Sequence, residues 1–263
     1  MRGAGATRRA FPGLLVAATA LALLFLTLPI VAVFVDTTPR RLLASLDDEG
    51  AREALWLSLK TTALALAIIV VVGTPAAWLL ASRTFRGRQV AITLVELPLV
   101  LPPAVAGIAL LAALGPNGVL GGALEDAGIR LPLTTAAVVT ALTFVASPFY
   151  VRQAQAAFAS VDRTLVDASR TLGASEARTF ARVVIPTAAP GLIAGGALAL
   201  GRALGEFGAT LMFAGSFEGV TQTVPLAIYD RFATDFDAAL ALSAVLVAVS
   251  AAILLVAKLG ARA

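Results

Sequence analysis

The chain has 263 residues, of which 59% are hydrophobic and 14% are charged, and its mean hydropathy is +0.92. Soluble domains are about 45–50% apolar and about 25% charged, so a soluble globular fold is excluded and much of the surface must face lipid. Histidine and cysteine are absent, which removes the commonest general base, disulfides and thiolate metal sites. In such a chain the net charge of +4 concerns membrane orientation rather than nucleic acid.

Six stretches are apolar enough to span a membrane, which needs roughly 20 residues. They are residues 11–35, 57–81, 90–114, 134–151, 191–214 and 238–259. Arg8 and Arg9 before the first stretch could belong to a secretory signal peptide, but the length of the stretch and the lack of a small-x-small cleavage site favour an uncleaved helix. The predicted fold class is an all-α membrane protein of about six transmembrane helices.

The basic residues predict the orientation. With the N-terminus inside, 13 of the 20 Lys and Arg fall in cytoplasmic segments and 5 fall in outer loops, while Lys60 and Arg202 lie in spans. This bias places both termini in the cytoplasm of a multi-pass protein of the cell membrane. We find no internal repeat, which speaks against many secondary-transporter folds. We therefore expect one transmembrane domain, 1–263, that works as a homodimer.

The longest non-membrane stretch, 152–190, is predicted to be cytoplasmic. Asp162 is expected to cap a short helix with an apolar side, and Gly173 to end it in a left-handed turn. Ser175 is expected to cap a second helix, with Pro186 marking the return to the membrane. The pattern predicts two short helices separated by a kink.

The spacing in this stretch resembles the EAA loop of ABC-importer permeases: acidic-Ala-Ala, three residues, Gly, nine residues, Ile-x-Leu-Pro. The departures are Asp for Glu, Ser for the second Ala, and Val and Ile for Ile and Leu. The matching residues are Asp167, Ala168, Ser169, Gly173, Val183, Ile185 and Pro186. The resemblance implies that the loop docks in a cleft of a separate ATP-binding subunit and transmits its movement. The alternative is an amphipathic linker on lipid headgroups.

Arg202 and Glu206 in the fifth stretch are four residues apart, which predicts one helix face and an ion pair. Gly201, Gly205 and Ala209 repeat at the same spacing, which permits close helix packing. Two interpretations stay open for the charged pair. It could fix a helix interface, or it could line a polar pathway in which Arg202 helps an anion to cross.

The third stretch contains Pro98, Pro102 and Pro103, which predict irregular backbone. Such backbone at membrane depth must face protein or a water-filled cavity, so the pathway is the expected place for it. The alternative is a kinked helix near the interface, with Glu96 reaching the cytoplasm.

Four runs resemble molybdate/tungstate permeases: 98–103, 153–173, 202–210 and 219–229. Sulfate permeases share the Gly-Glu-Phe-Gly element. The resemblance implies the type I architecture of ABC-importer permeases. The residues that it and the spans suggest for the translocation pathway are Arg202, Glu206, Pro102, Pro103, Thr221, Gln222 and Thr223.

The expected function is the permease subunit of an ATP-driven oxyanion importer, most simply of molybdate or tungstate. The expected partners are two copies of an ABC ATPase, which would hold ATP and Mg, and an extracytoplasmic substrate-binding protein. The chain has no Gly-x4-Gly-Lys-Ser/Thr loop, so no ATPase activity, cofactor or metal is expected on it. The alternatives are a sulfate/thiosulfate permease, an ion-coupled carrier or channel that works alone, and, remotely, an intramembrane enzyme.

Overall fold

The computed structural model describes residues 4–38, 40, 42, 45 and 47–260, and all regular elements in these ranges are helices. The long helices are α1 (Ala4–Val35), α3 (Glu49–Ser82), α7 (Thr135–Ala159), α10 (Ile185–Leu204) and α13 (Phe236–Gly260). The others are α4 (Arg88–Val100), α5 (Pro103–Leu114), α6 (Gly121–Asp126), α8 (Arg163–Thr171), α9 (Glu176–Thr179), the π-helix η1 (Phe180–Val184), α11 (Gly208–Ala214) and α12 (Val224–Phe232). The predicted all-α class is confirmed.

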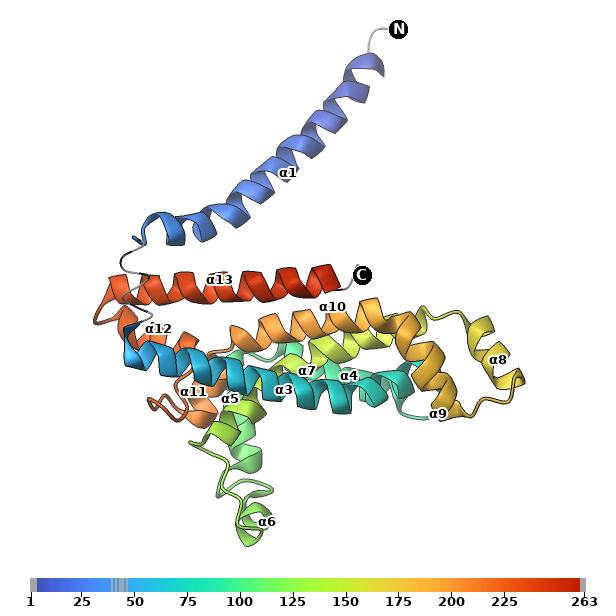
Figure 1. The fold of residues 1–263 in the computed structure, drawn as a ribbon. Helices are drawn as coiled ribbons and strands as arrows, with labels where there is room; N and C mark the ends of the chain where they lie inside the picture. The colour runs from blue at the N-terminus through green and yellow to red at the C-terminus, as the bar shows by residue number, and fades with distance from the viewer. Residues whose placement is uncertain (1–3, 39, 41, 43–44, 46, 261–263) are drawn as a thin grey trace.

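Five helices of the described ranges are long and apolar enough to cross a membrane, and the bent pair of α4 and α5 would make a sixth crossing. Figure 1 shows α8 and α9 at one end of the bundle, with α12 and the start of α3 at the opposite end. The start of α1 and the end of α13 both point toward the end that carries α8. Of the residues used for the charge count, Arg2, Arg41 and Arg262 lie outside the described residues.

The core is built around α7, which packs between α3 and α10. Tyr150 of α7 is buried, and its hydroxyl lies 2.6 Å from the Thr74 hydroxyl of α3. Its ring lies so close to Gly73 that a Cβ there would be 3.0 Å from a ring carbon. The three helices therefore meet where an aromatic residue fills space that a side chain on α3 would occupy.

The third predicted span is not one helix. The axes of α4 and α5 differ by 119°, and the chain breaks between Val100 and Pro103. Pro98 is accommodated inside α4, whereas Pro103 opens a new helix, where its missing N–H costs little. The predicted irregular backbone is confirmed at Pro102 and Pro103, whereas at Pro98 the chain stays helical.

The fifth span differs from the predicted range of 191–214. A continuous helical run extends from Glu176 through η1 to Leu204, and α11 is a separate short helix. The run does not begin at Pro186, which falls in the first turn of α10. A proline in that turn does not interrupt the run, because the hydrogen bonds of η1 carry the helix past it.

Candidate functional site

The helix α8 of the segment 152–190 is capped at both ends as its sequence predicts. The Asp162 carboxylate accepts from the Thr164 N–H at 2.9 Å, and this bond lowers the pKa of Asp162. At the other end Gly173 has φ +81°, and the Ala174 N–H donates to the Ser169 carbonyl at 3.1 Å. A left-handed residue followed by this bond closes a helix without leaving carbonyls unpaired. The short helix is thus specified locally.

The next helix starts at Ser175, whose hydroxyl accepts from the Arg178 N–H at 3.3 Å. It continues through the five residues of η1, where the Ile185 N–H donates to the Phe180 carbonyl. A π-helical turn of this kind holds an extra residue without breaking the helix. The segment therefore joins α10 without a flexible linker.

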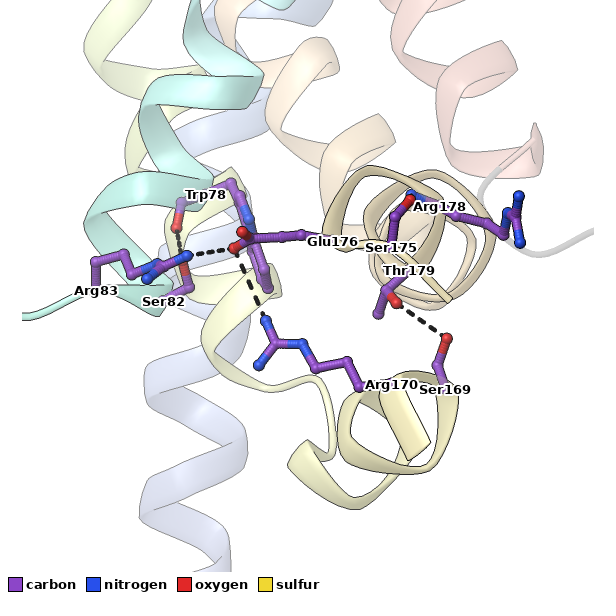
Figure 2. A network of polar contacts seen from close by, with 9 residues as sticks. All are labelled: Trp78, Ser82, Arg83, Ser169, Arg170, Ser175, Glu176, Arg178 and Thr179. Atoms are coloured by element: carbon purple, nitrogen blue, oxygen red, sulfur yellow. Dashed lines mark hydrogen bonds and ion pairs between the residues drawn. The ribbon is translucent and has the colours of Figure 1, made fainter. Parts of the chain in front are cut away.

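Polar contacts hold α8 against the bundle, as Figure 2 shows. The Glu176 carboxylate pairs with Arg83, which follows α3, and lies 3.8 Å from an Nη of Arg170 in α8. The Ser169 and Thr179 hydroxyls lie 3.0 Å apart and join α8 to α9. One carboxylate thus connects α3, α8 and α9.

Three aromatic side chains beside this attachment join α3, α7 and η1 to one another. Trp78 of α3 lies 5.4 Å from both Phe158 of α7 and Phe180 of η1, measured between ring centroids. Such pairs contribute about 0.5–1.5 kcal/mol each beyond their buried area. Beside them a cleft of about 370 Å³ separates the end of α3 from α8, and it is lined by Trp78, Phe158, Arg163 and Asp167 among others.

The residues expected to dock on the ATP-binding subunit fall into two groups. Asp167, Ala168 and Gly173 are exposed on α8 and its end, whereas Ser169 is half-buried by its bond to Thr179. Val183, Ile185 and Pro186 belong to η1 and α10, where the first two are half-buried and the third is exposed. The structure does not bring the two groups into one patch. Leu172, which the motif did not single out, is 87% exposed.

A second candidate region lies where α10 ends. Arg202 and Glu206 form an ion pair with 2.5 Å between Nη2 and Oε2, and Glu206 is 1% exposed. The pair is confirmed, but the two residues do not share a helix, because α10 ends at Leu204. The second carboxylate oxygen of Glu206 accepts from the Ala209 N–H at 2.7 Å, so this side chain orders the start of α11.

The break is closed by contact between α5 and α11. A Cβ on Gly208 would lie 2.8 Å from the Pro103 Cβ, and a Cβ on Gly107 would lie 2.6 Å from that of Met212. These two glycines make the close helix contact. At the four-residue repeat, Gly201 has no neighbour among the described residues within 4 Å of an added Cβ, whereas the Ala209 backbone packs closely against Gly107. Pro102, next to the break, is exposed.

The polar residues of the last outer loop organise that loop itself. The Thr221 hydroxyl accepts from the Phe217 N–H at 3.0 Å, and the Gln222 amide donates to Asp230 at 2.7 Å. The Thr223 hydroxyl is buried without a hydrogen-bond partner among the described residues. No described hydrogen bond or ion pair joins this trio to Arg202 or Glu206.

A ring contact connects α12, which follows the loop 215–223, to the residue before α11. Phe207, which precedes α11, lies 5.0 Å from Tyr229 of α12 between ring centroids. At the same end the Asp48 carboxylate caps α3 and pairs with Arg231 of α12. The hydrogen bond from Arg231, with that from the Ala51 N–H, lowers the pKa of Asp48. These contacts fix α12 over the outer end of the bundle.

Sequence reasoning missed the residues that attach α8, because they are far apart in the chain. Arg83, Glu176, Trp78, Phe158 and Phe180 meet only in the fold, and no local pattern marks them. It also placed Glu96 at the interface as one alternative. In the structure Glu96 pairs with Arg152 of α7, at 2.9 Å. Within the described ranges no cluster of three or more Asp or Glu could hold a metal ion.

The comparisons with known proteins point in one direction. The pattern of the family described as "Binding-protein-dependent transport system inner membrane component" matches residues 73–263. The molybdenum transport system permease protein ModB of Mycobacterium tuberculosis is 45% identical over 235 residues, covering 89% of this chain and 88% of that protein. The protein of the same name from Escherichia coli K12 is 40% identical over 69% of this chain and 80% of its own length.

Solved structures share the fold. A bacterial ABC transporter that imports the acidic polysaccharide alginate contains a chain that matches with a TM-score of 0.78 and 20% identity, over 97% of this chain and 96% of that one. A chain of the MetNI methionine ABC transporter in an inward-facing conformation matches with a TM-score of 0.62 and 19% identity, over 80% and 93% of the two chains. The predicted type I permease architecture is confirmed by this likeness.

Proposed function

The chain belongs to the family of binding-protein-dependent transport system inner membrane components, and from that premise we propose that it is the membrane-spanning subunit of an ATP-driven molybdate importer. As a permease it is a transport component rather than an enzyme. The proposal of molybdate rests on relatives named for molybdenum transport in bacteria and, at 41% identity over 90% of this chain, in Haloferax volcanii. Tungstate, a dianion of similar shape, is the natural second cargo.

The coupling role is assigned to 152–190, and within it to α8. Two ABC ATPase subunits, which hold ATP and Mg, would each receive one α8 from a homodimer of this chain. ATP binding would draw the two helices together and open the pathway outward, and hydrolysis would reset it. A substrate-binding protein would deliver the oxyanion at the end that carries α12. In this orientation both termini are cytoplasmic.

The observation that carries this proposal is the form of α8. It is capped at both ends, it is joined to α9 on one side by the Ser169–Thr179 and Arg170–Glu176 contacts, and its other side presents Ala168, Leu172 and Gly173 to the surroundings. An exposed Leu beside small residues fits a socket in a partner and has no role in this chain's own packing. A linker lying on lipid would not need the capped ends or the Glu176 attachment.

The pathway is assigned to the region where α4 meets α5 and α10 meets α11. The residues assigned are Pro102, Pro103, Arg202 and Glu206, with Thr221, Gln222 and Thr223 on the outer side. Two helices broken at membrane depth are tolerated only against protein or water. In a homodimer the two breaks would face each other across the axis, and this explains why exposed polar backbone is retained there.

The proposal is tested by reconstituting the chain with its ATPase and binding protein in proteoliposomes. We expect molybdate to stimulate ATP hydrolysis and to accumulate with ATP only, and sulfate to do so more weakly. Gly173→Asp should lower both rates at least about tenfold, because it places a charge in the docking interface. Asp tolerates the left-handed conformation, so the fold should persist.

Gly87→Asp is the matched control, since Gly87 has φ +85° and, like Gly173, no neighbour within 4 Å of an added Cβ. This variant should keep both rates. Molybdate uptake without any ATPase would show a carrier that works alone. Unchanged coupling in Gly173→Asp would remove α8 from the docking role.

A further inference from the structure

Glu96 and Arg152 form a second Arg–Glu pair that no part of the coupling scheme uses. Arg152 Nε lies 2.9 Å from Glu96 Oε1, and the pair joins α4 to α7. Glu96 is about two turns into α4, and Arg152 is about two turns before the end of α7, so each lies about 10–12 Å inside its helix. Both helices reach these ends near Arg88 and Ala159, on the side of the bundle that carries α8.

The predicted fourth span ends before Arg152, whereas the structure places Arg152 inside α7, a candidate span that continues to Ala159. The side chains of Arg152 and Glu96 are 48% and 37% exposed, although both lie on helices of candidate spans. Charges within a span are retained where they face water or protein rather than lipid. Only one oxygen of Glu96 is engaged in the described structure. The remaining contact of Arg152 is a 3.5 Å approach of Nη1 to the Gln155 side chain.

The Glu96–Arg152 pair is linked through α4 to the break between α4 and α5. α4 continues from Glu96 for about one more turn and then passes into Pro103, which packs on Gly208. Gly208 follows Glu206 by two residues. The two Arg–Glu pairs are therefore linked through residues 96–103, the contact of Pro103 with Gly208, and residues 206–208. The pairs differ in one respect: Glu206 is buried and fixed by Ala209, whereas Glu96 is accessible and held by Arg152 alone.

On the basis of the proposed function, we propose that Arg152 is an oxyanion-binding residue in the cytoplasmic half of the pathway, and that Glu96 neutralises it when no cargo is present. A guanidinium has five N–H donors. Glu96 uses the Nε side of Arg152 and Gln155 approaches Nη1 at 3.5 Å, so the remaining Nη donors are open to a tetrahedral dianion. The dianion carries twice the charge of Glu96 and displaces it. The freed carboxylate then repels the dianion, which keeps its residence short.

A purely structural pair makes a different prediction. Removing one partner of a buried structural pair is harmful and removing both is close to neutral, whereas removing either partner of a half-exposed structural pair costs little stability. If Arg152 binds cargo, the double variant must remain defective. The complete complex with ATPase and binding protein is therefore reconstituted with Arg152→Gln, with Glu96→Gln/Arg152→Gln, with Arg152→Lys and with the control Arg86→Gln, an exposed arginine in the cytoplasmic turn.

We expect ATP-driven molybdate uptake to fall about tenfold or more in Arg152→Gln and equally in the double variant, because a charge-assisted hydrogen bond is lost in both. Arg152→Lys should be intermediate, and Arg86→Gln should match the parent. Recovery of uptake in the double variant would overturn the proposal in favour of a structural pair. An inactive parent complex would instead refute the molybdate assignment, so the two failures are distinguishable.

Chemical rescue gives a readout that packing cannot imitate. The chain has no cysteine, so Arg152→Cys carries a single thiol in this subunit. The purified subunit is modified before assembly with a thiosulfonate that adds either an aminoethyl cation or an ethylsulfonate anion. The cation should restore uptake and the anion should not, and molybdate should slow the modification. Equal effects of the two reagents would overturn the proposal.

Discussion

The two ends of the helical run from Glu176 to Leu204 differ in the exposure of the contacts that hold them. At one end α8 is fastened by accessible contacts: the side chains of Arg83 and Glu176 are 57% and 54% exposed. At the other end Glu206 is 1% exposed and serves as ion-pair partner and cap at once. The α8 end is the one proposed to move with a partner, and its contacts are ones that water can replace at low cost. The Glu206 end fixes α10 and α11, and its buried contacts have no such replacement.

The largest effect that this contrast predicts is on stability. Glu206→Ala should lower the free energy of unfolding by about 3–5 kcal/mol, because it leaves Arg202 unpaired and α11 uncapped. Glu96→Ala removes an acidic partner from an exposed pair and should cost only about 0–1 kcal/mol. Thermal unfolding of the two variants in the same detergent measures the difference. Equal losses would contradict the contrast.

A smaller effect is expected where α5 meets α11. Gly107→Ala adds a Cβ 2.6 Å from the Met212 Cβ and 2.7 Å from the Ala209 carbonyl, which should cost about 1–3 kcal/mol of overpacking. Gly196→Ala is the matched helical control, since nothing lies within 4 Å of its Cβ, and there we expect a gain of up to about 1 kcal/mol. Melting temperatures of the two should move in opposite directions.

At the α8 end the aromatic contacts should matter more than the ion pairs. Trp78→Leu loses two ring contacts of about 0.5–1.5 kcal/mol each, and it should raise the ATP consumed per molybdate transported. Trp56→Leu on the same helix is the control, because Trp56 is 69% exposed. If both variants keep the parental stoichiometry, the aromatic cluster does not position α8.

The smallest expected effect concerns Asp48 at the outer end. Its pKa is lowered in the fold from an ordinary value near 3.8, so its contribution is present above that value and disappears as the pH falls through the lowered pKa. The side chain is 44% exposed, so the contribution stays below about 1 kcal/mol. The stability difference between the parent and Asp48→Asn should be constant from pH 7 to pH 5 and vanish well below pH 4.

Local signals explain what could be predicted from the sequence. Asp162, Gly173 and Ser175 act within a few residues of themselves, so the caps and the kink around α8 were predictable. The existence of the apolar spans and of the break at Pro102 and Pro103 was predictable for the same reason.

What the sequence could not supply depends on distant partners. Whether a helix stops at Leu204 or runs on to Ala214 is decided by Glu206 turning back to cap α11 against α5. The pairing of Glu96 with Arg152 requires α4 to lie against α7, and nothing near either residue announces it. The aromatic contacts among Trp78, Phe158 and Phe180, which join α3, α7 and η1, are non-local in the same way.

The absence of a flexible joint between α9 and α10 has a mechanical consequence. Helical backbone continues from Glu176 to Leu204, so the run acts as one rod of about 40 Å along its path, although Pro186 and Pro190 each lack an N–H for the helix. Torque applied at one tip must reach the other, where the glycine that follows Leu204 is the first place that can yield. The π-helical turn at Phe180–Val184 adds compliance about the axis without severing the rod. Nucleotide binding in a partner and movement at the buried carboxylate would then be a single rotation observed at two places.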